Sequence, residues 1–349
     1  DKFRALAVEL AGLPPAQTLE RLNATDPFGT RTFERRLLDE ETRLGRTLEL
    51  SELRQLFACP DRRISQPDAR NRTAAQLYRD RTPGYFIFFQ HLRKAGGTQF
   101  CNLAEHNLQK HELPRYYCMP DYHWKDTVGS AGSLHHYTNK VIADHMLEDG
   151  YRIAGNEWDM FNPRQHFDLP AVFVTSFRQP LDRALSQFRF ECVEDRGCTA
   201  KTIEVYWDRR QQLHNVYTQT FADPEMPAGR APYHALSQRF TGTSEEDAQF
   251  RRETMGTALD TIRRFHVVTS LEFLSYAEPL IQQVLGFERT ESLTQRVRPH
   301  IQQFKRNDGQ DENTLGAAGI KKASWDPREY LSPEQYKIMS ETLALDEIL

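Results

Sequence analysis

The sequence predicts an α/β protein in which helices cover both faces of a central, mostly parallel sheet, so that the fold has three layers. Two short apolar runs carry this prediction, 85–89 (YFIFF) and 171–177 (AVFVTSF). Both are rich in aromatic and β-branched residues, as strands buried on both faces are. Each is followed by a loop and then by a stretch of helical periodicity. Strands that alternate with helices in this way build parallel sheets.

The other elements are expected by the same reasoning. Residues 151–155 (YRIAG) and 266–270 (HVVTS) are predicted to be strands, and a helix is expected to follow the second one through Leu285. Residues 112–150 are rich in Tyr, His and Gly and are expected to form long loops over a site.

The composition restricts the class of protein. The chain has 349 residues, of which 39% are hydrophobic and 27% are charged, as in ordinary globular proteins. A net charge of −4 excludes the broad basic field of nucleic-acid-binding proteins. No apolar run approaches the roughly 20 residues that a membrane span needs. We therefore expect no nucleic-acid partner, and local basic clusters must carry any anion recognition.

The first 80 residues differ from the rest by being polar and rich in arginine. From Phe33 to Phe57 leucines recur at roughly helical spacing between charged residues: Leu37, Leu38, Leu44, Leu48, Leu50 and Leu53. This pattern predicts a helical N-terminal extension, 1–80, packed on a main domain, 81–349. A partly disordered stem is the alternative.

A loop suited to an anion lies between the first predicted strand and a helix expected from Thr98 to about Gln109. Gly96 and Gly97 allow a tight turn and a close approach of the backbone to a ligand. The helix amides and dipole favour a negative group. A Walker loop ends in Gly-Lys-Ser/Thr, whereas Lys94 precedes the glycines. An ordinary Gly-Gly turn is the alternative. The predicted ligand-binding residues are Lys94, Ala95, Gly96, Gly97, Thr98 and Gln99.

A second candidate site follows the strand at 171–177. Arg178 comes just after the strand, where α/β folds place ligand contacts. Arg183, Ser186 and Arg189 follow at intervals of three and form a row along a helix. Arg178 and Ser186 could grip one phosphate from two sides, with Arg183 beside them. The alternative is a surface helix with solvated arginines, which we favour for Arg189.

The helix after Arg178 is expected to begin at Pro180, since proline suits the first helical position. Its residues Leu181, Leu185 and Phe188 form an apolar stripe. We expect this stripe to hold the helix on the sheet.

Taken together, the two motifs resemble those of the Golgi carbohydrate sulfotransferases, and most closely the heparan sulfate 2-O/6-O-sulfotransferase group. In that family a strand leads into a His-x-x-Lys-Thr-Gly-Gly-Thr loop that binds a 5'-phosphosulfate, and 91–98 reads HLRKAGGT. A later strand leads into an Arg-x-Pro-x-x-Arg-x-x-Ser stretch that binds a 3'-phosphate, and 178–186 reads RQPLDRALS. Ala95 stands where the family usually has Thr. The resemblance covers roughly residues 85–345.

The resemblance implies a P-loop-like sulfotransferase fold and the donor 3'-phosphoadenosine 5'-phosphosulfate (PAPS), with PAP as product. It implies in-line transfer of a sulfuryl group to an acceptor hydroxyl, most simply on a glycan, without a metal. It also implies a type II membrane protein of the Golgi lumen whose anchor lies outside this chain. Two sequons, at Asn23 and Asn71, point the same way and would make the chain a glycoprotein.

A general base must remove the proton of the acceptor hydroxyl. The resembled group uses a His shortly before the second motif, where this chain reads AGNEWD at 154–159. Asn156 lies near that position, and we expect the adjacent Glu157 to be the base, with its pKa raised beside Trp158. His145 is the second candidate. His91 and His123 follow, although each of the three histidines is more readily explained as a packed or surface residue.

Two features keep alternative interpretations. A late basic cluster could clamp the cofactor, hold an anionic acceptor or be solvated; it comprises Arg296, Arg298, His300, Lys305 and Arg306. Cys192 and Cys198 could close a small loop in an oxidising compartment or remain free thiols.

Three other functions remain open. The first is a P-loop kinase or nucleotide hydrolase, which needs a Mg²⁺ ligand and an acidic residue at a strand end. Thr98 could supply the first, but the run 171–177 ends in no acidic residue. The second is sulfation of a tyrosine or a small alcohol. The third is a PAP-binding module without catalysis.

Overall fold

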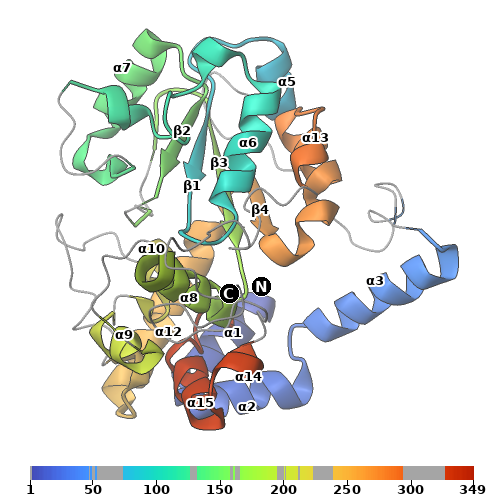
Figure 1. The fold of residues 1–349 in the computed structure, drawn as a ribbon, viewed down its shortest axis with the longest axis vertical. Helices are drawn as coiled ribbons and strands as arrows, with labels where there is room; N and C mark the ends of the chain where they lie inside the picture. Colours follow the sequence, from blue (N-terminus) through green and yellow to red (C-terminus); the bar gives the residue numbers. More distant parts are fainter. Residues whose placement is uncertain are drawn as a thin grey trace, which may run out of the picture.

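The structure is a computed structural model, shown in Figure 1. It describes residues 2–46, 48, 52, 74–125, 132–157, 160–161, 166–194, 200, 202–210, 213–222, 239–293 and 327–349.

A four-stranded parallel sheet forms the centre of the molecule, with the order β2-β1-β3-β4. In the register of the sheet, Phe88 lies beside Ala154 on one side and Phe173 on the other. The prediction of an α/β fold with a parallel sheet is therefore confirmed. The strands are β1 (Phe86–Gln90), β2 (Ile153–Asn156), β3 (Ala171–Phe177) and β4 (Val267–Ser270).

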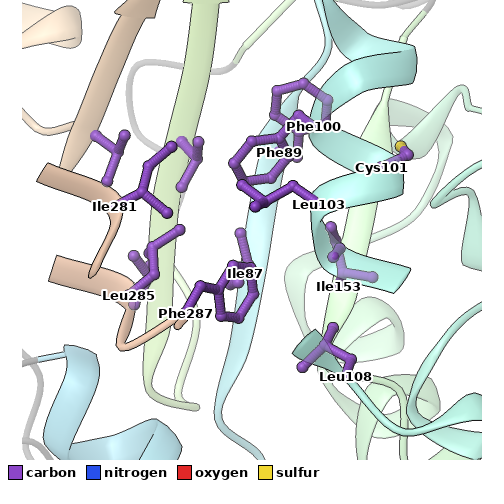
Figure 2. Close-up of a cluster of buried hydrophobic side chains, with 14 of the residues drawn as sticks. Ile87, Phe89, Phe100, Cys101, Leu103, Leu108, Ile153, Ile281, Leu285 and Phe287 are labelled. Atoms are coloured by element: carbon purple, nitrogen blue, oxygen red, sulfur yellow. The ribbon is translucent and has the colours of Figure 1, made fainter. Parts of the chain in front are cut away.

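Alternation along β1 divides the core into two parts, because successive side chains point to opposite faces of a sheet. Ile87 and Phe89 pack against α6 (Gly97–Asn107), α13 (Glu278–Leu285) and α5 (Ala74–Arg79), as Figure 2 shows for the first two helices.

Phe86 and Phe88 pack on the opposite face of the sheet, in the second core cluster. The helices of that layer are α7 (Asn139–Asp149), α10 (Val216–Ala222) and α12 (Glu245–Ile262). Helices thus cover both faces of the sheet. The strands are continuously apolar because both of their faces are buried.

The helix that follows β3, α8 (Pro180–Arg189), begins at Pro180 as expected. Its position differs from the prediction, because Leu181 and Leu185 pack on α9 (Ile203–Arg209), α14 (Pro327–Tyr330) and α15 (Pro333–Thr342). The expectation that this stripe lies on the sheet was wrong. Figure 1 shows α8 beyond the carboxyl ends of the strands. An apolar stripe indicates that a helix face is buried, but it does not identify the partner.

The N-terminal residues form α1 (Lys2–Gly12), α2 (Pro15–Thr25) and α3 (Thr30–Leu44). The α1 side chains Leu10 and Ala11 share a core cluster with Met255 of α12 and with Leu345. The helix expected to reach Phe57 ends at Leu44. The next residue, Gly45, terminates it by adopting the left-handed conformation (φ 68°) that is common at helix C-termini. Leu50 and Leu53 lie outside the described residues.

The expectation of irregular structure throughout 112–150 was wrong for α7. Thr138 caps this helix by accepting a hydrogen bond from the Val141 N–H at 3.3 Å, and Gly150 ends it with φ 71°. The rest contains short 3₁₀ turns: η2 (Lys110–Glu112), η3 (Pro120–His123) and η4 (Leu134–His136).

A disulfide that the sequence did not indicate joins Cys101 of α6 to Cys118. Cys192 is disulfide-bonded as well. Its expected partner, Cys198, lies outside the described residues.

Within the described part of the chain, no helix has the length and apolar character needed to cross a bilayer.

Candidate anion-binding site

The loop after β1 turns back into α6 through two residues with positive φ. Lys94 has φ 64°, and Gly96, the residue before the helix, has φ 97°. The left-handed region favours glycine and strains other residues, so the backbone of Lys94 is held by its surroundings. The first N–H groups of a helix lack partners within the helix. The loop therefore presents amides next to a cation.

Gly97 is required by the ring of His91. A Cβ at residue 97 would lie 1.6 Å from Nε2 of His91. The imidazole stacks on Phe89, with 5.3 Å between ring centroids and 10° between planes, and His91 is buried. His91 therefore packs over the loop, as the simpler interpretation of this histidine has it.

The two predicted motifs are in direct contact. The Ser176 hydroxyl donates to the carbonyl of Ala95 at 2.7 Å, and Nη1 of Arg178 donates to the carbonyl of Lys94 at 3.4 Å. Both loops leave the carboxyl edge of the sheet, from the neighbouring strands β1 and β3. The strand order reverses between these two strands, and open α/β sheets bind ligands at such a point.

The two cations of the site have different supports. The ammonium of Lys94 lies 4.3 Å from the ring centroid of Phe190, in a cation–π contact. Arg178 is fixed through its backbone by Tyr217. The Arg178 N–H donates to the Tyr217 hydroxyl at 3.2 Å, and this hydroxyl donates to the Arg178 carbonyl at 2.9 Å. No pattern in the sequence links Tyr217 to Arg178.

The start of α10, which carries Tyr217, is held in turn by Asp346. Its carboxylate accepts hydrogen bonds from the N–H groups of Tyr217 at 3.0 Å and Thr218 at 2.8 Å, and from the Thr218 hydroxyl at 2.9 Å. Burial raises the pKa of Asp346 to about 6, although these hydrogen bonds oppose the change.

A cavity of about 650 Å³ opens beside Arg178 at the ends of β3 and β4. This volume lies within the range of small-molecule sites, about 300–1,000 Å³. The aromatic and charged residues of its wall include Phe3, Phe28, Phe177, Tyr217, Arg178 and Glu347. Burial raises the pKa of Glu347 to about 7.

Other predicted ligand-binding residues are placed differently. Nε2 of Gln99 donates to the carbonyls of Ser292 at 3.1 Å and Leu293 at 2.5 Å, so this side chain ties α6 to η8 (Glu291–Leu293). Ala95 is buried, and Thr98 is half-buried at the start of α6.

The row of polar residues along α8 is largely enclosed. Arg183 is buried, donates from Nη2 to the Leu213 carbonyl at 3.4 Å and lies 5.7 Å from the ring centroid of Tyr217. Arg189 is buried too, so the expectation of a solvated arginine was wrong. The residues packed around α8 leave little of that helix face to solvent. Ser186 is half-buried on the same helix.

Glu157 follows β2 and lies beside the first loop. Its side chain is 15% exposed; Oε1 is 3.5 Å from Nε of Arg93, and Oε2 is 3.9 Å from Nδ1 of His91. Arg93 also contacts Glu191 at 3.3 Å. Burial lowers the pKa of Arg93, and the carboxylates of Glu157 and Glu191 oppose this change. Glu157 therefore lies between the Arg93 guanidinium and the His91 imidazole, and a carboxylate held there can accept a proton as a general base does.

The remaining candidate bases are elsewhere. His145 stacks on Trp124 at 4.3 Å, and the Trp124 Nε1 donates to Asp149 at the end of α7. His145 lies on α7, the helix that leads into the amino end of β2, whereas Lys94 follows the carboxyl end of β1. His123 is exposed.

Asn156 has a structural role at the end of β2. Its Nδ2 donates to Oε1 of Gln90 at 2.9 Å, and its Oδ1 accepts from the Leu134 N–H at 3.2 Å. The amide therefore joins β2 to β1 and to the turn before α7.

Several predicted features lie outside the described residues: Trp158, Asn71 and the cluster Arg296, Arg298, His300, Lys305 and Arg306. Among the residues that are described, no group of three or more His, Cys, Asp or Glu side chains could hold a metal ion. Arg93 was the neighbour of Glu157 that sequence reasoning missed, since nothing local links positions 93 and 157.

No protein-family model, no curated protein and no solved structure matches the chain. The site itself must therefore support any functional proposal.

Proposed function

We propose that the chain is a sulfotransferase that moves a sulfuryl group from PAPS to an acceptor hydroxyl, most simply on a glycan of the secretory pathway. The observation that carries this proposal is the contact between the two loops. Lys94 and Arg178 occupy positions whose counterparts in the resembled family bind the two ends of one bisphosphate donor. The two residues follow adjacent strands, and the Arg178 guanidinium donates to the Lys94 carbonyl.

The described residues fit such a donor. Gly96 opens α6 with no Cβ at the turn, and Lys94 supplies a positive charge beside the helix amides. Arg178 faces the 650 Å³ cavity, whose aromatic walls suit a nucleoside. The disulfide of Cys101 and Cys118 agrees with an oxidising compartment.

Bound PAPS would supply the activated sulfuryl group. In this proposal Lys94 stabilises negative charge on the oxygen of the departing nucleotide, as preorganised cations do in group transfer. Arg178 holds the 3'-phosphate through charge-assisted hydrogen bonds. The Glu157 carboxylate accepts the proton of the acceptor hydroxyl, and Arg93 orients this carboxylate.

The proposal is tested by calorimetry with PAP and by transfer of labelled sulfate from PAPS to glycans, peptides and small alcohols. The expected results are binding of PAP and labelling of at least one glycan without added metal. An absence of PAP binding would sink the proposal. Turnover of ATP that depends on Mg²⁺ would instead favour a kinase or hydrolase.

Lys94→Ala should reduce transfer by about 100-fold to 1,000-fold, since a preorganised charge that acts on the transition state is worth that much. Lys140→Ala is the matched control, because Lys140 is exposed on α7 and pairs with Asp144. Retention of most activity by Lys94→Ala would contradict the assigned role.

Glu157→Gln should lower kcat by at least about 100-fold and leave PAP affinity unchanged, because it removes only the proton acceptor. The pH–rate profile of the parent should lose its acidic limb in this variant. PAP binding with no transfer in the parent would indicate a non-catalytic binding module.

A further inference from the structure

A row of rings leads from the surface of the protein to Glu157. Tyr122 stacks on Tyr116 with 4.6 Å between centroids and 26° between planes. The ring centroids of Tyr116 and Tyr117 are 6.3 Å apart, and those of Tyr117 and His91 are 5.7 Å apart. Nδ1 of His91 is 3.9 Å from Oε2 of Glu157. The outer two tyrosines are therefore connected to the candidate base by consecutive contacts.

Tyr116 and Tyr122 are unusually open to solvent. They are 50% and 52% exposed, whereas large aromatic rings are mostly buried in folded proteins. We call this pair the tyrosine platform. A tyrosine ring offers an apolar face and a polar edge, and it loses little conformational entropy on binding. A pair of stacked, half-exposed rings is a surface for a flat, amphipathic ligand.

The platform is held to the site by covalent and backbone links. The disulfide ties Cys118, close to both tyrosines in sequence, to α6. The Gly155 N–H of β2 donates to the Cys118 carbonyl at 2.5 Å. A Cβ at residue 155 would lie 3.0 Å from that oxygen, so glycine permits the close approach.

A second link joins the same loop to Glu157 itself. The carboxylate of Asp121, next to Tyr122, accepts the N–H of Gly132 at 2.9 and 3.1 Å. The carbonyl of Gly132 accepts the N–H of Glu157 at 2.8 Å. The platform and the candidate base are thus fixed relative to each other, as a binding site needs.

We propose that the tyrosine platform binds a pyranose ring of the acceptor glycan and brings a nearby hydroxyl to Glu157; this rests on the proposed function. A sugar ring has an apolar C–H face for the tyrosines and equatorial hydroxyls for their polar edges. A free small phenol would need an enclosed pocket that buries most of its surface. An open platform instead suits one ring of a longer chain.

The test compares Tyr116→Ala and Tyr122→Ala with the parent in sulfate transfer to heparosan, chondroitin and poly-N-acetyllactosamine oligosaccharides. Each variant should raise the KM of the labelled glycan roughly ten-fold with little change in kcat, as loss of an aromatic stacking contact does. Tyr116→Phe and Tyr122→Phe keep the rings and should stay within about two-fold of the parent. Leu38→Ala removes a 60% exposed side chain on α3 and is the control.

Saturation-transfer NMR with the same oligosaccharides measures sugar binding without chemistry. Sugar signals should appear with the parent and weaken in both alanine variants. An unchanged KM or an unchanged NMR response would overturn the platform proposal, as would labelling confined to peptides or small alcohols. PAP affinity, measured in parallel, should be the same in all variants; its absence from the parent would overturn the donor proposal alone.

Discussion

The loops after β1 and β3 contribute the two cations of the site, but they are held in different ways. In the first loop Gly97 makes room for His91, and His91 stacks on Phe89, so the contacts that fix this ring fall within nine consecutive residues. In the second, Arg178 depends on the hydroxyl of Tyr217, which is 39 residues away. The start of α10 depends in turn on Asp346, a further 129 residues along the chain.

One loop of the site is therefore supported by its neighbours in the sequence, and the other by residues far along the chain. The first loop should respond to changes in its own residues. The second should also respond to changes in α10 and in the C-terminal segment, which hold the backbone of Arg178 from a distance in the sequence.

The largest effect is expected for Gly97→Ala. The added Cβ would overlap the imidazole of His91 and displace it from Phe89, at a cost of about 3 kcal/mol in the free energy of unfolding. Urea denaturation measures this change. Gly256→Ala, in the middle of α12, is the control; there the nearest atom is the flexible Arg4 Nη2 at 3.1 Å. It should be neutral or slightly stabilising.

The double variant His91→Ala with Gly97→Ala should recover part of the lost stability, because it removes the overlapping ring. Equal stability of Gly97→Ala and the parent would refute the local account of the first loop.

Asp346→Asn tests the second loop through pH. The carboxyl has a pKa of about 6 in the folded protein and 3.8 as its ordinary value. Between these values the folded state holds a proton that the unfolded state lacks. The contribution of this group is therefore fully present below about pH 4 and is lost as the pH rises through 6.

The parent should accordingly gain stability relative to Asp346→Asn as the pH falls. Over pH 6 to 4.5 the gain should be about 2 kcal/mol, at 1.36 kcal/mol per pH unit. Paired urea titrations at several pH values give the difference. A difference that does not vary with pH would show that the carboxyl is not buried as described.

The smallest effect is expected for Tyr217→Phe. Losing the hydroxyl removes two hydrogen bonds to the backbone of Arg178, which costs about 1 kcal/mol of stability. PAP should bind about five-fold more weakly, by the tenfold per 1.4 kcal/mol relation. Adenosine 5'-monophosphate, which lacks the 3'-phosphate, should bind equally to both proteins. If Tyr217→Phe weakened the binding of both nucleotides equally, Tyr217 would have no specific role in positioning Arg178.

The local signals in the sequence were sufficient for the sheet and for the two loops. The run 171–177 is β3 residue for residue, and β1, β2 and β4 lie within one or two residues of their predicted ends. Buried strands, a proline at a helix start and paired glycines are encoded within a few residues. The helix α7 was missed although Thr138 and Gly150 mark its ends, because the tyrosines and histidines around it favoured loops.

Contacts between distant positions were decided only in the folded molecule. They include the burial of α8 away from the sheet, the Cys101–Cys118 disulfide, the support of Arg178 by Tyr217, and the placement of Arg93 beside Glu157. The spacing of apolar residues indicates that one face of a helix or strand is buried, and the residue type indicates which contacts a side chain can make. Which partner it meets depends on how the whole chain closes around the sheet, so this information came from the tertiary structure.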